Sequence, residues 1–283
     1  MHKSDSYKRI ALALAAGTAA TLGFVVKLSQ QLKDMQLHIL WKARQQPSFV
    51  YDTEDDEGRP MRVLSVGGRW QSGCYLDESL RTTPPFAYLR SFDHMFDTAL
   101  PISKVLVVGG GAYSYPKHLV SSRDEIRVDV VEPDHAITQA AYDYFFLKDC
   151  IERTADRLRI IPQYGHDYLS ESIELYDVII NDAFDGAQPS PELAGERGAL
   201  LARDHLIQGG LYMLNVVCSS GMRGVQSLQR CVEELGRVFT SVHVIPCSDE
   251  GLSDMDNYLV IGSDGAHSFI GELAGGAPQL ELD

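Results

Sequence analysis

Two carboxylates that could act on a cationic substrate follow one short apolar run of the sequence. Asp182 and Asp185 come directly after residues 178–180 in the segment YDVIINDAFDG. Two acids three positions apart, in a turn after a strand, can face one cation, and a carboxylate can take a proton from a reacting amine. The alternative is structural, with both residues shaping the turn and capping the next helix.

A run of glycines earlier in the chain could hold a nucleoside. The segment VLVVGGG ends in Gly109, Gly110 and Gly111, which let the backbone turn sharply and a ligand approach without a Cβ in the way. Glu132 ends the next apolar run, 23 residues after Gly109. An acid at about this distance accepts hydrogen bonds from ribose hydroxyls in nucleotide-binding folds. The alternative is a purely structural turn; NAD is disfavoured because the full GxGxxG pattern is missing.

Besides Glu132, Asp167 is a candidate for contact with a nucleoside. Glu132 is expected to bind the ligand rather than to stabilise the fold, because only a polar ligand would give a carboxylate at the end of a strand a favourable interaction. Asp167 follows the apolar run 158–161 in YGHDYL and could accept a hydrogen bond from the adenine amino group. Its alternative role is that of a helix N-cap.

The elements that must position these residues alternate between strand and helix. Apolar runs at 105–108, 126–131, 158–161, 178–180 and 211–217 are separated by segments long enough for crossover helices. This pattern predicts a doubly wound, Rossmann-like α/β fold with a mainly parallel sheet, whose carboxyl edge carries the ligand site. Runs 242–245 and 258–261 should close the sheet as an antiparallel pair. Residues 48–76 predict a small antiparallel β meander, and a helix follows Pro84 and Pro85.

The amino terminus contains an uncharged stretch, residues 10–26, between basic residues. Its interpretations are a single membrane anchor, a cleaved signal peptide or a soluble Ala-rich helix. Leu28, Leu32, Met35 and Ile39 share one helical face, which predicts that a helix continues to about Arg44 and ends before Pro47. The predicted divisions are 1–46 (apolar helix and linker), 47–83 (small β subdomain), 84–263 (catalytic domain) and 264–283 (loosely ordered tail).

The composition excludes several classes of protein. The 25 Lys and Arg against 39 Asp and Glu give a net charge of −14, which argues against a nucleic-acid partner. The acidic balance suits a cationic ligand, but solubility is the preferred explanation. No two of the five cysteines form a CxxC pair, so we expect free thiols and no metal site.

The segment from about residue 49 to residue 262 resembles the spermidine synthase family of aminopropyltransferases, especially its diverged bacterial branch. The matching motifs are VLVVGGG, VEPD, GHDYL and YDVIINDAFD, and upstream VGGRWQSGCYLDES is similar to the LDGxxQ segment of the family. The resemblance implies a class I methyltransferase-like fold, a homo-oligomer and a sulfonium cofactor, decarboxylated S-adenosylmethionine or S-adenosylmethionine itself. Because that cofactor is intracellular, we expect the body to be cytoplasmic, whether or not residues 10–26 anchor it to a membrane.

The resemblance also implies a role for each candidate residue. The glycines would lie against the sulfur-bearing part of the cofactor, Glu132 would hold the ribose and Asp167 the adenine. Gln71 would contact substrate or cofactor from the N-terminal sheet. Asp182 would receive the proton of the attacking amine, and Asp185 would help to hold that small cationic amine.

The sequence departs from the family pattern in the half of the site that would hold the polyamine. Ala112 replaces the acid that contacts the aminopropyl ammonium, and the Tyr-His-Glu segment of the family is missing. Three functions therefore remain: aminopropyl transfer to a diamine such as putrescine, methyl transfer to an unknown acceptor, and a non-catalytic, membrane-tethered binding protein.

Overall fold

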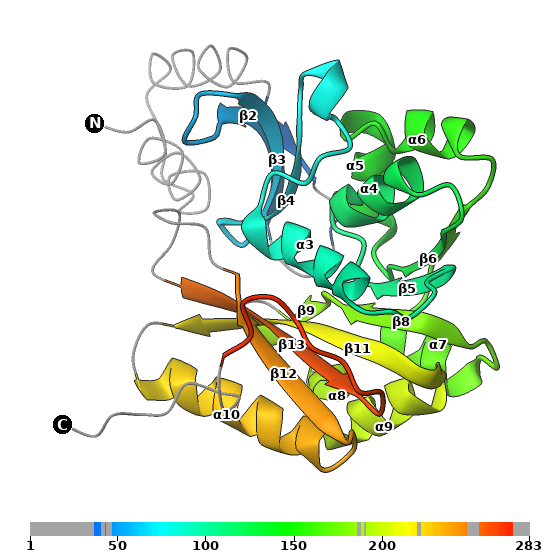
Figure 1. Cartoon of the computed structure of the whole chain (residues 1–283). Helices are drawn as coiled ribbons and strands as arrows, with labels where there is room; N and C mark the ends of the chain where they lie inside the picture. The colour runs from blue at the N-terminus through cyan, green and yellow to red at the C-terminus, as the bar shows by residue number, and fades with distance from the viewer. Residues whose placement is uncertain are drawn as a thin grey trace, which may run out of the picture.

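A seven-stranded sheet forms the centre of the computed structural model, which describes residues 37–40, 43, 47–185, 188–189, 191–219, 222–247 and 255–273. The strand order is β12-β13-β11-β8-β5-β6-β7 (Figure 1). Their bounds are β5 (Lys104–Val108), β6 (Arg127–Val131), β7 (Leu158–Ile161), β8 (Tyr176–Asn181), β11 (Leu206–Ser219), β12 (Ser241–Pro246) and β13 (Met255–Ser263).

Strands β5, β6, β7, β8 and β11 pair in parallel, and β13 pairs antiparallel with both β11 and β12. The order reverses beside β5, where β6 lies on one side and β8 on the other. The carboxyl edge at such a reversal is open to a ligand because the crossover connections leave in opposite directions. The predicted Rossmann-like fold, with its final antiparallel pair, is confirmed.

Helices cover both faces of this sheet (Figure 1). Alternate residues of β5 explain why: Val105 and Val107 belong to one apolar cluster, whereas Leu106 and Val108 belong to another. A strand buried on both faces is apolar at successive positions, as β5 is from Val105 to Val108. One face carries α4 (Ser114–Ser122), α5 (His135–Tyr144) and α6 (Leu147–Arg153). The other carries α7 (Gly165–Glu171), α8 (Pro191–Ala194), α9 (Glu196–Asp204) and α10 (Met222–Gly236).

A second, antiparallel sheet precedes the central one. Its strands, in spatial order, are β1 (His38–Ile39), β2 (Ser48–Glu54), β3 (Pro60–Val66) and β4 (Arg69–Tyr75). The chain then forms the 3₁₀ helix Glu78–Leu80, α3 (Ala87–Ser91) and the 3₁₀ helix Phe92–Asp97. A short pair, β9 (Phe184–Asp185) and β10 (Gln188–Pro189), follows β8.

Hydrogen bonds of two serine hydroxyl groups connect this second sheet to the central body. The Oγ atoms of Ser72 on β4 and Ser114 on α4 lie 2.8 Å apart. The Ser114 hydroxyl also donates to the Gly73 carbonyl, and the Gly73 N–H donates back to it at 3.3 Å. All three residues adjoin the start of α4, so the β4 strand is held directly beside the glycine loop.

Two expectations for the chain ends do not hold in the described residues. His38 and Ile39 form strand β1, paired with Val50 and Phe49, so the helix predicted to reach Arg44 is wrong at these positions. The free edge of β2 supplies backbone partners that a helix could not use. In the predicted loose tail, Phe269 is buried and the Leu273 N–H donates to Val244 at 2.9 Å. Residues 264–273 therefore pack against the body.

The uncharged stretch 10–26 lies outside the described residues. Within the described part of the chain, none of the helices combines the length and apolar character that crossing a membrane requires.

Candidate active site

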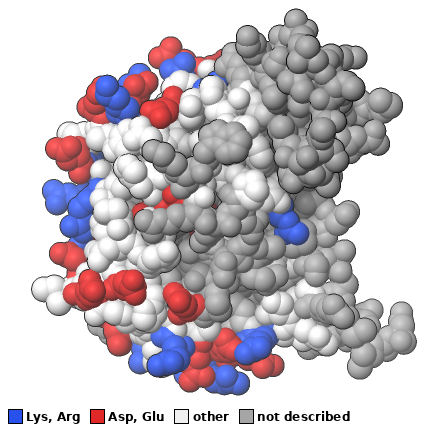
Figure 2. Space-filling view, turned by 180° about the vertical axis from the view of Figure 1, so that it is seen from behind, with Lys and Arg blue, Asp and Glu red and all other residues white. Residues whose placement is uncertain are grey.

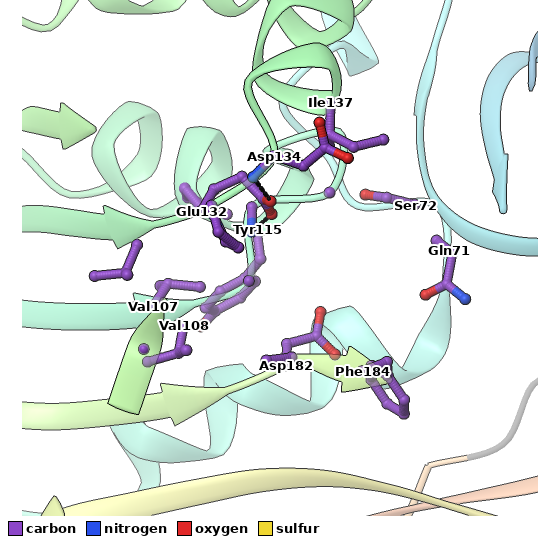
Figure 3. A pocket seen from close by; sticks show the side chains of 18 of the residues that line it. Gln71, Ser72, Val107, Val108, Tyr115, Glu132, Asp134, Ile137, Asp182 and Phe184 are labelled. Carbon is purple, nitrogen blue, oxygen red and sulfur yellow. Dashed lines mark hydrogen bonds between the residues drawn. The ribbon is translucent and has the colours of Figure 1, made fainter. Parts of the chain in front are cut away.

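A cavity of about 350 Å³ opens at the carboxyl edge of β5, β6 and β8. Figure 3 shows its walls: the β5 and β6 strand ends lie on one side, and Gln71 and Ser72 face them from β4. The cavity therefore lies between the two sheets of the fold. Residues more than 100 positions apart, such as Gln71 and Asp182, face the same space.

The glycine loop forms the floor of this cavity and needs glycine at its first position. Gly109 has a φ of +98°, a conformation that L side chains rarely adopt. A Cβ there would lie 2.6 Å from the carbonyl oxygen of Asp182, well inside van der Waals contact. The loop and the end of β8 are thus packed backbone to backbone, and the Asp182 N–H donates to Val108 at 2.9 Å.

Glu132 organises this loop as well as facing the cavity. One carboxylate oxygen accepts the Gly110 N–H at 2.9 Å, and the other accepts the Asp134 N–H at 2.8 Å. Burial raises the pKa of Glu132. The expectation that this carboxylate serves only a ligand is wrong, since it also stabilises the loop. Each oxygen keeps a second lone pair, so ribose hydroxyls could still be bound.

Asp182 occupies the turn directly after β8 and points its carboxylate into the open space of the cavity (Figure 3). Its Oδ1 accepts a hydrogen bond from Asn215 Nδ2 at 3.0 Å. Burial raises the pKa of Asp182 to about 7. A carboxyl group with this pKa can take up and release a proton near neutral pH, as general acid–base chemistry requires. Asn181 turns the other way and donates to the Tyr212 hydroxyl at 3.2 Å.

Gln71 faces Asp182 across the cavity from strand β4 (Figure 3). Its backbone carbonyl accepts a hydrogen bond from the Tyr88 hydroxyl, which joins β4 to α3. Phe184 of β9 lies beside Asp182 on the same side of the opening. A reacting group between Gln71 and Asp182 would therefore meet one amide, one carboxylate and one aromatic ring.

The structure does not bring Asp167 to the cavity wall. Asp167 lies in the first turn of α7 with its side chain 60% exposed, and its carboxylate lies 3.6 Å from the ring of His166. The wall is formed there by Tyr164, Gly165 and His166. An acid in the first turn of a helix is favoured by the helix dipole alone. Asp185 contributes its backbone to β9, and its side chain lies outside the described part of the structure.

Several lining residues were not singled out from the sequence, among them Ser72, Tyr115, Asp134, Ile137 and Leu193. Asn215, which contacts Asp182, was also missed. The sequence could have indicated Asn215, because it is a polar residue inside the apolar run of β11. Such a residue in a buried strand needs a polar partner.

The charges on the wall are all of one sign. Glu132, Asp134, Asp182 and Glu192 contribute carboxyl groups, and no Lys or Arg occurs among the described lining residues. Groups of His, Cys, Asp and Glu that could hold a metal ion were not found in the described part of the chain. The carboxyl groups of the described wall therefore favour a cation over an anion.

Comparison with known proteins assigns the family. The sequence pattern of the spermine/spermidine synthase domain matches residues 86–251, more than half of the chain. The chain belongs to the spermine/spermidine synthase family. The match covers the glycine loop, Glu132, Asp182 and Asn215, so the family resemblance expected from VLVVGGG and YDVIINDAFD is confirmed.

Curated relatives in this family carry names that describe aminopropyl transfer. A polyamine aminopropyltransferase of Thermococcus kodakarensis is 31% identical over 115 residues, or 39% of this chain and 40% of that protein. One from Methanocaldococcus jannaschii is 31% identical over 122 residues, or 42% of this chain and 41% of that protein. The chain thus matches about two fifths of the length of these relatives.

Solved structures from the family share the fold. A probable spermidine synthase from Corynebacterium glutamicum superposes with a TM-score of 0.63 at 23% identity, over 78% of each chain. The spermidine synthase of Thermotoga maritima gives a TM-score of 0.57 at 18% identity, over 82% of this chain and 74% of that one. At these identities the likeness establishes the fold of this spermine/spermidine synthase family member.

The outer surface contrasts with this cavity wall. In the space-filling view from behind, Lys and Arg side chains lie among Asp and Glu side chains along the left and lower edges of the molecule (Figure 2). Charges of both signs therefore occur together at these edges, whereas the described wall of the cavity carries carboxyl groups without a matching Lys or Arg.

Proposed function

We propose that the protein transfers an aminopropyl group from decarboxylated S-adenosylmethionine to a small cationic amine, with a diamine such as putrescine as the acceptor. The observation that carries this proposal is the charge of the cavity: four carboxyl groups and no Lys or Arg among the described lining residues. Both substrates are purely cationic, since the decarboxylated cofactor has a sulfonium and an ammonium group but no carboxylate.

Asp182 is the base of the proposed reaction. An alkylamine with a pKa near that of lysine, about 10.4, arrives protonated and cannot attack. Asp182 takes one proton from the ammonium group, and the freed nitrogen lone pair forms a bond to the methylene carbon beside the sulfur. That carbon–sulfur bond breaks, and its electron pair stays on sulfur as a neutral thioether. The sulfonium supplies the leaving group, so no general acid is needed.

The remaining candidate residues hold the two substrates in line. Glu132 supports the proposed ribose contact and fixes the loop through the Gly110 N–H. Gly109 and Gly111 let the sulfur approach the backbone, and Gln71 closes the opposite wall. Positioning of this kind accounts for much of the rate of a two-substrate displacement. Asp185 is retained as a proposed contact of the acceptor amine.

A second candidate function is methyl transfer from S-adenosylmethionine. Ala112, which replaces the family acid after the glycines, favours it because an acid there would repel the methionine carboxylate. The side chain of Ala112 is fully buried, however, and packs with Leu64 and Ile137. The absence of a cation from the described wall argues the other way, since a methionine carboxylate would be left without a charged partner.

Titration calorimetry with three ligands tests the proposal. Decarboxylated S-adenosylmethionine should bind at least tenfold more tightly than S-adenosylmethionine, because only the intact cofactor brings a carboxylate into an acidic cavity. Methylthioadenosine, which has the nucleoside and sulfur without a charged tail, separates the nucleoside contribution from that of the tail. Tighter binding of S-adenosylmethionine would support the methyltransferase instead, and binding of none would support a non-catalytic protein.

A further inference from the structure

Asn215 is the polar partner of the proposed base. It lies on β11, one residue after Leu214, which pairs with Asn181 of β8. This register places Asn215 directly beside Asp182, and its Nδ2 donates to Asp182 Oδ1 at 3.0 Å. Asn215 is 4% exposed, so the hydrogen bond is shielded from water. The two residues form an amide–carboxyl pair, and Asp182 is the member of the pair that lines the cavity.

The other half of the Asn215 amide is unsatisfied. Its Oδ1 is buried and has no hydrogen-bond partner, one of three such side-chain atoms in the described residues. A buried acceptor without a donor is unfavourable, and such groups are rare in folded proteins. The hydrogen bond to Asp182 is therefore the one described contact that fixes the orientation of the Asn215 amide group. Rotation about the Cβ–Cγ bond of asparagine is soft and roughly two-fold.

We propose that Asn215 is a positioning residue that serves both protonation states of Asp182 by turning its amide through half a turn. Nδ2 donates to the ionised carboxylate, and after the turn Oδ1 accepts from the protonated carboxyl. The oxygen and the amino group are nearly equal in size, so the turn leaves the packing of β11 unchanged. This role rests on the proposed function, in which Asp182 gains a proton in each cycle.

The proton balance gives the order of events. The acceptor ammonium transfers one proton to Asp182, which becomes neutral and acquires an O–H. The Asn215 N–H would then no longer face a charged acceptor, and the new O–H of Asp182 would have no hydrogen-bond acceptor. Turning the amide pairs the O–H with Oδ1. When the carboxyl group later releases its proton to solvent, the amide turns back and the carboxylate is ready for the next amine.

Asn215 supplies the one hydrogen bond that the Asp182 carboxylate makes to the described side chains. The other titratable groups of the described cavity wall make no hydrogen bond or ion pair with this carboxylate; they are Tyr115, Glu132, Asp134, Tyr164, His166 and Glu192. A charged partner such as Lys or Arg would hold the pKa of the base low. The neutral amide instead supports the base while leaving its pKa near 7.

Two substitutions at position 215 separate this role from simple packing. Asn215→Leu keeps the volume but can neither donate nor accept. It should lower kcat by at least tenfold, keep each KM within about threefold, and move the acidic limb of the kcat–pH profile up by about one unit. Asn215→Thr carries a hydroxyl that both donates and accepts, and should keep kcat within about threefold of the wild type.

A spectroscopic measurement follows the response of the Asn215 amide to the protonation of Asp182 and does not depend on activity. In full-length protein labelled with ¹⁵N-asparagine, the Asn215 side-chain amide is identified by its loss in Asn215→Thr. Its two proton signals should shift with the same midpoint as the Asp182 carboxyl band in infrared difference spectra. In Asp182→Asn the shift should vanish, because no titrating partner remains.

Two outcomes would overturn the proposal. One is an Asn215 amide whose signals do not move through the pH range in which Asp182 titrates. The other is an Asn215→Leu enzyme with the wild-type kcat and pH profile. Failure of the proposed function looks different: Asp182→Asn would keep its turnover, while the amide would still follow the titration of Asp182. If Asn215→Leu does not fold, the labelled wild type still decides the question.

Discussion

Replacing Asp182 with asparagine should lower kcat by about 10²–10⁴-fold, the usual contribution of a general base. Asparagine keeps the shape of the side chain but cannot take the proton of the attacking ammonium. Affinity for decarboxylated S-adenosylmethionine should stay within about threefold, because the proposed nucleoside contacts follow the ends of β5 and β6. In the wild type, kcat should rise as pH increases through about 7, where Asp182 ionises, and the variant should lack this limb.

Single-turnover rates with saturating cofactor and putrescine measure the effect on the chemical step. Asp124→Asn is the matched control, because Asp124 is a fully exposed carboxylate on the α4–β6 connection, outside the cavity wall. It should retain the wild-type rate. An Asp182→Asn rate within a few-fold of the wild type would mean that Asp182 is only a turn residue and that another group accepts the proton.

Substitution of Gly109 by alanine should reduce kcat/KM by on the order of 10²-fold or more. A Cβ at this position meets the Asp182 carbonyl at 2.6 Å, and the φ of +98° adds backbone strain. To relieve the overlap, either the glycine loop or the end of β8 must move. Either shift misplaces the cofactor or the base, and misplacement by about 1 Å can cost 10²-fold in rate.

Gly58→Ala is the control that separates the effect of backbone strain from the effect of steric overlap in Gly109→Ala. Gly58, in the turn between β2 and β3, has a φ of +76°, but a Cβ added there would meet no atom within 4 Å. Its substitution should lower the free energy of unfolding by about 1–2 kcal/mol without affecting the rate. Thermal unfolding and steady-state kinetics of both variants make the comparison. Equal kinetic losses in the two would show that the contact between Gly109 and Asp182 is unimportant.

The features that depended on local pattern could be predicted from the sequence. The β5 strand is apolar at every position from Val105 to Val108 because it is buried on both faces, and the chain then turns at glycines, of which Gly109 and Gly111 have a positive φ. The pairing of β12 with β13 followed from a connection too short for a crossover helix. The position of Asp182 at the carboxyl edge of the sheet could be predicted because Asp182 comes directly after the apolar run of β8.

The features that depended on contacts between distant segments could not be predicted. Strand β1 forms because β2 offers a free edge. The sequence of residues 37–40 contains no pattern that predicts this pairing. Glu132 binds the Gly110 N–H because the loop folds back over the end of β6. Asp167 misses the cavity because α7 begins at Gly165, and a shift of two residues along a helix turns a side chain by about 200°.

Burial of Asp182, the proposed base, also links folding to proton uptake. Asp182 has an ordinary carboxyl pKa of 3.8 in the unfolded chain and about 7 in the folded one. Between these values the folded state binds the proton that the unfolded state has released. The contribution of Asp182 to stability is therefore complete below about pH 4 and is lost as pH rises toward 7. The difference in unfolding free energy between the wild type and Asp182→Asn should follow this course. The unliganded protein thus loses stability under the very conditions that ionise Asp182, and a bound cationic amine would recover part of that loss by giving the carboxylate a counter-charge.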